Sequence, residues 1–227
     1  MKLVRQRHKL KLDIKVDTLT EQNKKKHGIL LPDSIRAVIA GSSGCGKTSL
    51  MLGLLEHPNG LRFENIYVYS KSLYQPKYSW LRAIMKAIPG MGYYEFDSKI
   101  LPVDEVKPNS IIIFDDVACE QQNIIREFYC MGRHKNLDMF YLTQTYTKIP
   151  KHLLRDNFNF IVLFKQDQLN LKHVYDEHVI GDVTFQTFLN MCSESWSTKF
   201  GFFVIDKTSG LNSGRFRKGF DEFFIND

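Results

Sequence analysis

The stretch 41–48 constrains this chain of 227 residues more than any other part of its sequence. It reads Gly-Ser-Ser-Gly-Cys-Gly-Lys-Thr and matches the pattern G-x-x-x-x-G-K-[ST] at every position. Residues 35–41 are apolar enough for a short buried strand, and 48–57 predict a helix that ends at Pro58-Asn59-Gly60. A strand, a glycine-rich turn and a helix in this order form a cradle for phosphate groups, because backbone N–H groups and a helix N-terminus attract anions.

Each part of this motif has an expected task in holding a nucleotide. The glycines let the backbone adopt positive φ angles and approach the phosphates closely. Lys47 is expected to reach the β- and γ-phosphates, and the Thr48 hydroxyl to bind Mg²⁺. The expected nucleotide-binding residues are Gly41, Ser42, Ser43, Gly44, Cys45, Gly46, Lys47, Thr48 and Ser49.

The rest of the chain alternates between short apolar strands and helical stretches. Strands are expected at 64–70, 110–116, 139–144, 158–164 and 199–206, and helices at 78–88, 119–131, 150–155 and 168–193. Trp80, Ile84 and Ile88 are expected to share the apolar face of the helix at 78–88. Apolar strands without alternation, separated by helices, predict an α/β fold: a three-layer αβα sandwich with a mostly parallel central sheet.

Two adjacent acids end the strand at 110–116. Asp115 is expected to hold Mg²⁺ through its outer shell, opposite Thr48, because the carboxyl ends of parallel strands meet at one edge of the sheet. Asp116 is expected to act as general base on the attacking water. The alternative for either acid is to cap the helix that follows.

Three further polar residues are candidates for catalysis. Gln144 ends the strand at 139–144 and is expected to sense the γ-phosphate, unless it is an ordinary loop residue. Arg133 and Arg155 each precede a strand, and either is a candidate arginine finger that stabilises charge on the transferred phosphoryl group. A surface salt bridge is the alternative role for each arginine.

The formal net charge of +6 is concentrated at the N-terminus, because residues 1–26 contain nine Lys or Arg and three Asp or Glu. We interpret 1–27 as a basic arm that binds nucleic acid or another anionic surface, or else as a solvated tail, and 28–227 as one domain. The segment KLKLDIKV within the arm alternates charged and apolar residues, a pattern typical of an edge strand. The four cysteines form no C-x-x-C pair, which favours reduced thiols in an intracellular compartment, and no apolar run is long enough to span a membrane.

Three stretches resemble the poxvirus-type genome-packaging ATPases of large DNA viruses, virophages and polinton-like elements, within the FtsK–HerA superfamily of P-loop motors. They are GSSGCGKTSLM at 41–51, IIIFDD at 111–116 and GRHKNLDMFYLTQTYTKIPKHLLRDN at 132–157. The first is common to all P-loop proteins, whereas the third is much more specific. The resemblance spans roughly residues 29–165.

The resemblance implies a RecA-like P-loop ATPase domain that uses ATP and Mg²⁺, with an additional strand between the phosphate-loop strand and the acidic strand. It implies a hexameric or pentameric ring that pumps double-stranded DNA into a preformed capsid, attached at portal or vertex proteins. The expected location is the host cytoplasm (a viral factory), the nucleus or the virion. The superfamily usually has Glu where Asp116 stands, and Glu120 is a weaker substitute. No nuclease domain is recognised, so DNA cleavage is not expected.

Two other functions remain open at this point. One is a nucleoside or small-molecule kinase, although no compact Arg-rich lid follows the fourth strand. The other is an ATP-binding capsid assembly factor without motor activity. A GTPase is disfavoured because the N-K-x-D motif is absent. In a motor, Lys71, Lys77, Lys148 and Lys151 are candidate DNA contacts, or else solvated surface lysines.

Overall fold

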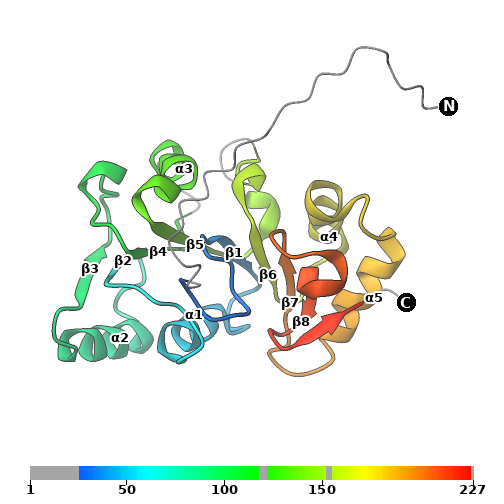
Figure 1. Cartoon of the computed structure of the whole chain (residues 1–227), viewed down its shortest axis with the longest axis horizontal. Helices are drawn as coiled ribbons and strands as arrows, with labels where there is room; N and C mark the ends of the chain where they lie inside the picture. Colours follow the sequence, from blue (N-terminus) through cyan, green and yellow to red (C-terminus); the bar gives the residue numbers. More distant parts are fainter. Residues whose placement is uncertain (1–25, 118–121, 152–154, 226–227) are drawn as a thin grey trace, which may run out of the picture.

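The computed structural model describes residues 26–117, 122–151 and 155–225. These residues form a nine-stranded sheet in the order β3-β2-β4-β5-β1-β6-β7-β8-β9 (Figure 1). The strands are β1 (Arg36–Ala40), β2 (Asn65–Ser70), β3 (Gly92–Phe96), β4 (Ser110–Asp115), β5 (Leu137–Thr143), β6 (Phe160–Leu163), β7 (Phe203–Asp206), β8 (Phe216–Lys218) and β9 (Glu222–Phe224). The pairs from β3 to β6 are parallel, and the pairs from β6 to β9 are antiparallel.

Helices cover both faces of this sheet, as the unalternating apolar strands predict. The helices are α1 (Lys47–Glu56), α2 (Pro76–Ala87), α3 (Gln122–Met131), α4 (Gln168–Val174) and α5 (Phe185–Ser195). One apolar core contains the buried side chains of α1 and α2, and a second core on the other face contains those of α3, α4 and α5 (Figure 1). The expected α/β sandwich with a mostly parallel sheet is therefore confirmed.

The strand order places β5 between β1 and β4. The pairing is parallel on both sides, with Ala40 opposite Thr143 and Asp115 opposite Leu142. This is the additional strand that the resemblance implies between the phosphate-loop strand and the acidic strand. Because all three strands run in the same direction, their carboxyl ends meet at one edge.

Some element predictions are wrong. The single helix expected at 168–193 is divided into α4, a π-helical turn (Tyr175–Val179) and α5, because Gly181 has φ 95° and Thr184 caps α5 by accepting from the N–H of Thr187. The apolar face expected for the helix at 78–88 is wrong for two of its three residues, since only Ile84 packs against the core. The side chains of Tyr78, Leu81 and Met85 are buried instead, whereas Trp80 and Ile88 are exposed. Strands β3, β8 and β9 were not expected.

The N-terminal part of the described chain is held at the amino edge of β5. Lys26 Nζ lies 2.6 Å from Asp138 Oδ2, and His27 Nε2 lies 3.0 Å from the same oxygen. Asp138 also accepts from the N–H of Ile35 at 2.7 Å. Lys26 and His27, which we interpreted as part of the arm, thus contact the folded domain.

The segment expected as an edge strand lies outside the described residues, as does Glu120. Among the helices described, none combines the length and apolar character needed to cross a membrane.

Candidate nucleotide-binding site

The glycine-rich turn connects β1 directly to α1. β1 ends at Ala40, α1 begins at Lys47, and Gly46 caps that helix with φ 115°, a conformation that favours glycine. A side chain at Gly41 would come within 2.6 Å of Phe164 Cβ, so the turn also needs a small residue for close packing. The structure therefore presents the first N–H groups of α1 at the edge where β1, β4 and β5 end.

Lys47 lies across its own turn. Its Nζ donates to the carbonyl oxygen of Gly41 at 2.6 Å and to that of Ser42 at 3.0 Å. These are neutral acceptors, so the positive charge of Lys47 is not neutralised by them. A phosphate group placed in the turn would therefore compete well for this ammonium group.

A pocket of about 330 Å³ opens in front of this turn and gathers most of the predicted site residues. Its lining comes from the turn, from the ends of β4 and β5, and from the segment that precedes and begins α2. The lining residues are Ser43, Gly44, Gly46, Lys47, Thr48, Ser72, Gln75, Lys77, Asp115, Asp116, Leu142, Thr143 and Gln144. Residues from four separate segments of the chain thus converge on one polar cavity.

The two acids at the end of β4 have different surroundings. Asp115 is buried, with 8% of its surface exposed, and accepts a hydrogen bond from the Tyr78 hydroxyl. Asp116 is exposed, has φ 56°, and its N–H donates to Leu142 O at 3.2 Å. The segment 118–121, which connects Val117 to the first described residue of α3, Gln122, lies outside the described residues. Both acids line the pocket.

Burial raises the pKa of Asp115 above its ordinary value, because a charged carboxylate loses hydration there. The hydrogen bond from Tyr78 and the positive charge of Lys47 oppose this effect, and the negative charge of Asp116 adds to it. Burial and the Asp115 charge raise the pKa of the Tyr78 hydroxyl, so Tyr78 stays protonated and donates. Tyr78 therefore supports the ionised form of the acid.

The oxygen donors of this pocket suit Mg²⁺. Thr48 supplies a hydroxyl, and Asp115 and Asp116 supply carboxylates within the same cavity. Within the described ranges, no cluster of three or more His, Cys, Asp and Glu could hold a metal ion. Mg²⁺ commonly relies on one or two carboxylates, substrate phosphates and water rather than on a cage of protein ligands. The residues present thus fit an ion that arrives with a nucleotide.

Gln144 lies at the same pocket, directly after β5. Its side chain is exposed, and the preceding Thr143 hydroxyl donates to Thr145 O at 3.2 Å. Because Thr143 is opposite Ala40, the last residue of β1, Gln144 comes one position past the end of β1, level with the start of the phosphate loop. The position is compatible with sensing a phosphate group.

The pocket lining includes residues that were not predicted for it: Ser72, Gln75, Lys77, Leu142 and Thr143. Lys77 Nζ donates to Ser49 Oγ at 2.7 Å, and its charge lowers the pKa of Asp115. Lys77 therefore faces the phosphate loop. Tyr78 follows it in the first turn of α2. The available signal was the Pro at the start of a helix after β2, which places that helix N-terminus near the carboxyl edge of the sheet.

The two candidate finger arginines lie outside this pocket. Arg155 is buried, its Nη1 lies 2.8 Å from Glu177 Oε1, and its guanidinium lies over the ring of Tyr146. It therefore has the structural ion pair that we named as the alternative. Arg133 is exposed in the turn between α3 and β5, at the amino edge of the sheet, and no ion pair is described for it within the resolved ranges of the chain.

Comparisons with known proteins identify structural relatives only. No protein-family model and no curated protein sequence matches this chain. Among solved structures, the genome packaging NTPase B204 from Sulfolobus turreted icosahedral virus 2, in complex with sulfate, is similar with a TM-score of 0.55 at 15% identity, over 76% of this chain and 91% of that chain. B204, the DNA-packaging ATPase from Sulfolobus turreted icosahedral virus, gives a TM-score of 0.52 at 16% identity, over 76% and 92%.

The complex of the virus 2 protein with AMPPCP is also similar, with a TM-score of 0.51 at 14% identity, over 77% of this chain and 93% of that chain. The fold is that of a P-loop NTPase. At these identities the likeness concerns the fold, so the function of this chain is argued from its own site.

Proposed function

We propose that this chain is an ATP-hydrolysing DNA translocase that packages double-stranded viral DNA into a preformed capsid. The observation that carries the proposal is the convergence of the phosphate loop, the two acids of β4 and Gln144 on one pocket. Support for the packaging role comes from the fold shared with viral genome packaging NTPases and from the specific resemblance in residues 132–157. The net charge of +6 is consistent with a polyanionic partner.

In this proposal the phosphate loop binds ATP through its backbone N–H groups and through Lys47. Thr48 and, through water, Asp115 hold Mg²⁺, which neutralises charge on the phosphate oxygens when it is bound. Asp116 accepts the proton of the attacking water, and its exposed, positive-φ position leaves its carboxylate open to the pocket. Gln144 orients the water or the γ-phosphate from the neighbouring strand.

A ring of copies, hexameric or pentameric, completes the proposed machine. A cation from a neighbouring copy then stabilises charge on the transferred phosphoryl group. Arg133 is the better candidate of the two arginines, because it is exposed, whereas Glu177 holds Arg155 in a buried ion pair. Portal or vertex proteins of the capsid, and the host cytoplasm, nucleus or virion as location, belong to the same proposal.

The proposal is tested by measuring phosphate release with and without duplex DNA over a series of salt concentrations. We expect DNA to stimulate hydrolysis and the stimulation to weaken steeply with salt, because phosphate contacts release counterions. Lys47→Ala should abolish turnover with and without DNA, whereas Lys86→Ala, an exposed lysine in the last turn of α2, should not.

Equal hydrolysis with and without DNA at every salt concentration would contradict a motor. Transfer of phosphate to added nucleosides would instead support a kinase. A Lys47→Ala protein that still assembles capsids but no longer packages DNA is the result expected of a motor.

A further inference from the structure

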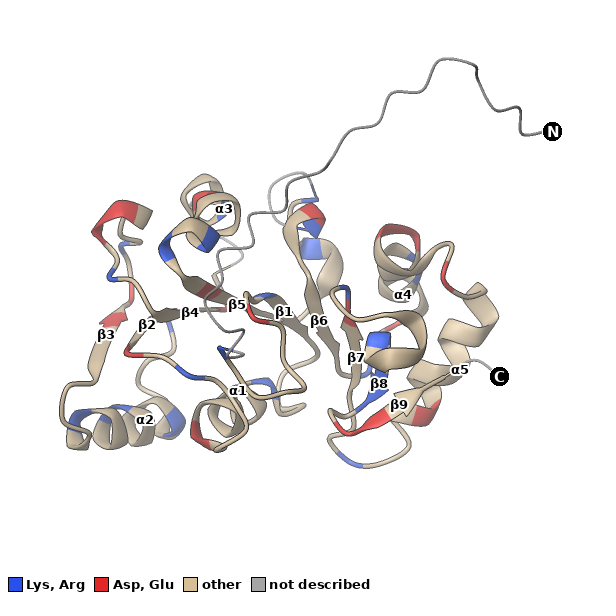
Figure 2. Cartoon of the chain, viewed as in Figure 1, with Lys and Arg blue, Asp and Glu red and all other residues tan. Residues whose placement is uncertain are grey.

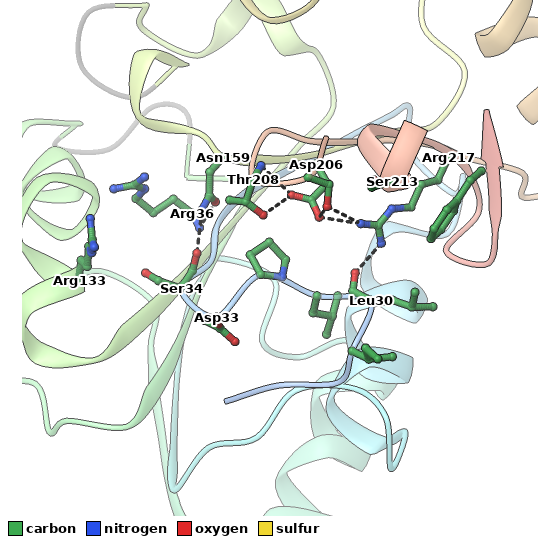
Figure 3. Close-up of a pocket in the computed structure, with 15 residues that line it drawn as sticks. Leu30, Asp33, Ser34, Arg36, Arg133, Asn159, Asp206, Thr208, Ser213 and Arg217 are labelled. Atoms are coloured by element: carbon green, nitrogen blue, oxygen red, sulfur yellow. Dashed lines mark hydrogen bonds and ion pairs between the residues drawn. The ribbon is translucent and has the colours of Figure 1, made fainter. Parts of the chain in front are cut away.

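A second cavity lies at the opposite edge of the sheet from the phosphate loop (Figure 3). It has a volume of about 670 Å³, twice that of the nucleotide pocket. Its walls come from residues 29–34, the first residue of β1, Arg133 in the turn before β5, Asn159 just before β6, the end of β7 with the segment after it, and β8 and β9. The nucleotide site uses none of these residues.

Hydrogen bonds fix the walls of this cavity. The Asn159 side chain accepts from the N–H of Arg36 at 2.8 Å and donates to Ser34 O at 2.7 Å, which holds the chain entering β1 (Figure 3). On the other side, Arg217 Nη2 lies 2.6 Å from Asp206 Oδ2, and both residues are buried. Their charges neutralise each other, so this pair adds no net charge to the cavity.

Two arginines remain without an acid at one end of the cavity. The Nε of Arg36 is buried and has no hydrogen-bond partner, and no ion pair joins Arg36 or Arg133 to an acid in the part of the chain that the structure describes. Burial and the positive charge of Arg133 lower the pKa of Arg36. Asp33 also lines the cavity, but Figure 3 shows its carboxylate directed away from both guanidinium groups.

An unpaired buried donor beside a second cation is costly in the free protein, and it requires an explanation such as an anionic ligand. We propose that Arg36 and Arg133 together form a binding site for one phosphate group at the amino edge of the sheet. Guanidinium groups bind phosphate in a bidentate manner, and Asn159 fixes the backbone from which Arg36 extends. The identity of the molecule that supplies this phosphate rests on the proposed function.

That phosphate belongs either to the DNA backbone or to a nucleotide held by a neighbouring copy. The surroundings favour DNA, and in that case Arg133 is not the arginine finger. Lys26 Nζ contacts Asn136 Oδ1 at 2.6 Å, three residues from Arg133, so the strongly basic residues 1–25 join the folded domain at this same edge. Figure 2 shows the Lys and Arg of the turn that follows α3, which are Arg133 itself and Lys135, and Lys135 lies 2.7 Å from Asp104. A chain of phosphates would contact several of these cations at once.

The test uses the full chain with Arg36→Gln, Arg133→Gln and the double substitution, and Arg62→Gln as a control, because Arg62 is exposed and lines neither cavity. The affinity for a duplex DNA oligonucleotide is measured over a range of salt concentrations, and phosphate release is measured without DNA at several protein concentrations. For DNA as the source, we expect the double variant to bind roughly tenfold more weakly, with a salt slope lower by about 1 for a lost phosphate contact.

For a neighbouring nucleotide as the source, DNA affinity would persist and kcat without DNA would fall at every protein concentration that supports a ring. If the double variant matches Arg62→Gln in both measurements, the phosphate site is overturned, whereas the proposed function stands as long as the wild type binds DNA and hydrolyses ATP. A melting temperature of Arg36→Gln well below that of the wild type would indicate a structural role for Arg36. The exposed Arg133→Gln variant alone then decides the outcome in the same two measurements.

Discussion

Tyr78 donates a hydrogen bond to Asp115 from the first turn of α2, and in this way it favours the ionised acid. Tyr78→Phe removes this hydrogen bond, which opposes the effect of burial on the pKa of Asp115. The pKa of Asp115 should therefore rise further. Asp115 then protonates at higher pH as the solution is acidified, and the acid side of the pH–rate profile should move upward by about one pH unit. The Mg²⁺ concentration needed for half-maximal hydrolysis should rise as well.

Tyr93→Phe is the matched control, because the Tyr93 hydroxyl donates to Glu95 at 2.6 Å and lines no part of the nucleotide pocket. An unchanged acid limb in Tyr78→Phe, together with an unchanged Mg²⁺ requirement, would exclude this positioning role.

Lys77 is a second positive charge at the phosphate loop, 2.7 Å from Ser49 Oγ. We expect Lys77→Ala to weaken the binding of ATP about tenfold, or about 1.4 kcal/mol, through the loss of charge near the phosphates. Lys77→Arg should recover most of this affinity. Equilibrium binding of a fluorescent ATP analogue measures the change, with Lys86→Ala at the other end of α2 as the control. Equal affinities for Lys77→Ala and Lys86→Ala would contradict the prediction.

At the scale of residues, the sequence predicts site residues well when they belong to one short motif, and poorly when the fold brings them together from distant parts of the chain. The phosphate loop is a local motif, and Asp115 directly ends an apolar strand, so both could be placed at the carboxyl edge. Lys77 reaches the same pocket, and Tyr78 reaches Asp115, because α2 packs beside α1, and the Pro at the start of α2 was the local signal for this placement. The ion pair of Arg155 could not be predicted, because its partner Glu177 lies on a turn that is distant in the sequence, and Arg155 therefore remained a candidate finger.

Among the elements, the π-helical turn Tyr175–Val179 joins two other parts of the second core. His178 Nε2 lies 2.6 Å from the Tyr146 hydroxyl, and its Nδ1 lies 3.3 Å from Lys207 Nζ at the end of β7. Burial lowers the pKa of His178 to about 3, and the charges of Lys207, Arg155 and Arg215 add to this effect. The imidazole is therefore neutral in the folded protein.

This network predicts a loss of stability in mild acid. As the pH falls below 6.5, the unfolded chain binds a proton at His178 and the folded chain does not, so the unfolded state is stabilised. The free energy of unfolding should fall by up to about 1.4 kcal/mol per pH unit between pH 6.5 and 5. Chemical denaturation at several pH values should show this slope reduced in His178→Gln and retained in His57→Gln, an exposed control. An equal slope in both variants would assign the acid sensitivity to other groups.

The predicted elements are correct where burial on both faces gives a continuous apolar run. They are wrong where contacts with neighbouring parts of the fold determine the secondary structure. The central residues of β1, β4 and β5 are apolar and buried because both faces of these strands are covered, and their polar residues lie at or next to the strand ends. The stretch 168–193 is apolar at helical spacing on both sides of Gly181, so the pattern does not reveal the break. β3 has half-buried residues throughout and pairs only with β2, and a weak pattern of this kind was not recognised as a strand.

At the scale of the whole molecule, the chain has two functional edges. The nucleotide pocket lies at the carboxyl ends of β1, β4 and β5, and the proposed phosphate site lies at their amino ends, across the thickness of the domain (Figures 1 and 3). The sequence could predict the first edge, because Gly-rich and acidic motifs follow strands. The second depends on Arg36, Arg133 and Asn159, of which the sequence singled out only Arg133, and the fold alone brings Arg133 to the same cavity as Arg36.

The separation of these edges gives a last prediction about charge. Residues 1–25 contain eight Lys or Arg and three Asp or Glu, and they precede Lys26, which is fixed at the amino edge. Replacing the eight basic residues by Gln should weaken DNA binding and lower its salt slope. Each phosphate contact that is lost reduces the number of counterions that DNA releases on binding. ATP hydrolysis without DNA should be unaffected, since the nucleotide pocket lies at the opposite edge. Anisotropy with labelled duplex DNA and phosphate release measure the two quantities, and an unchanged salt slope would show that the arm does not contact DNA.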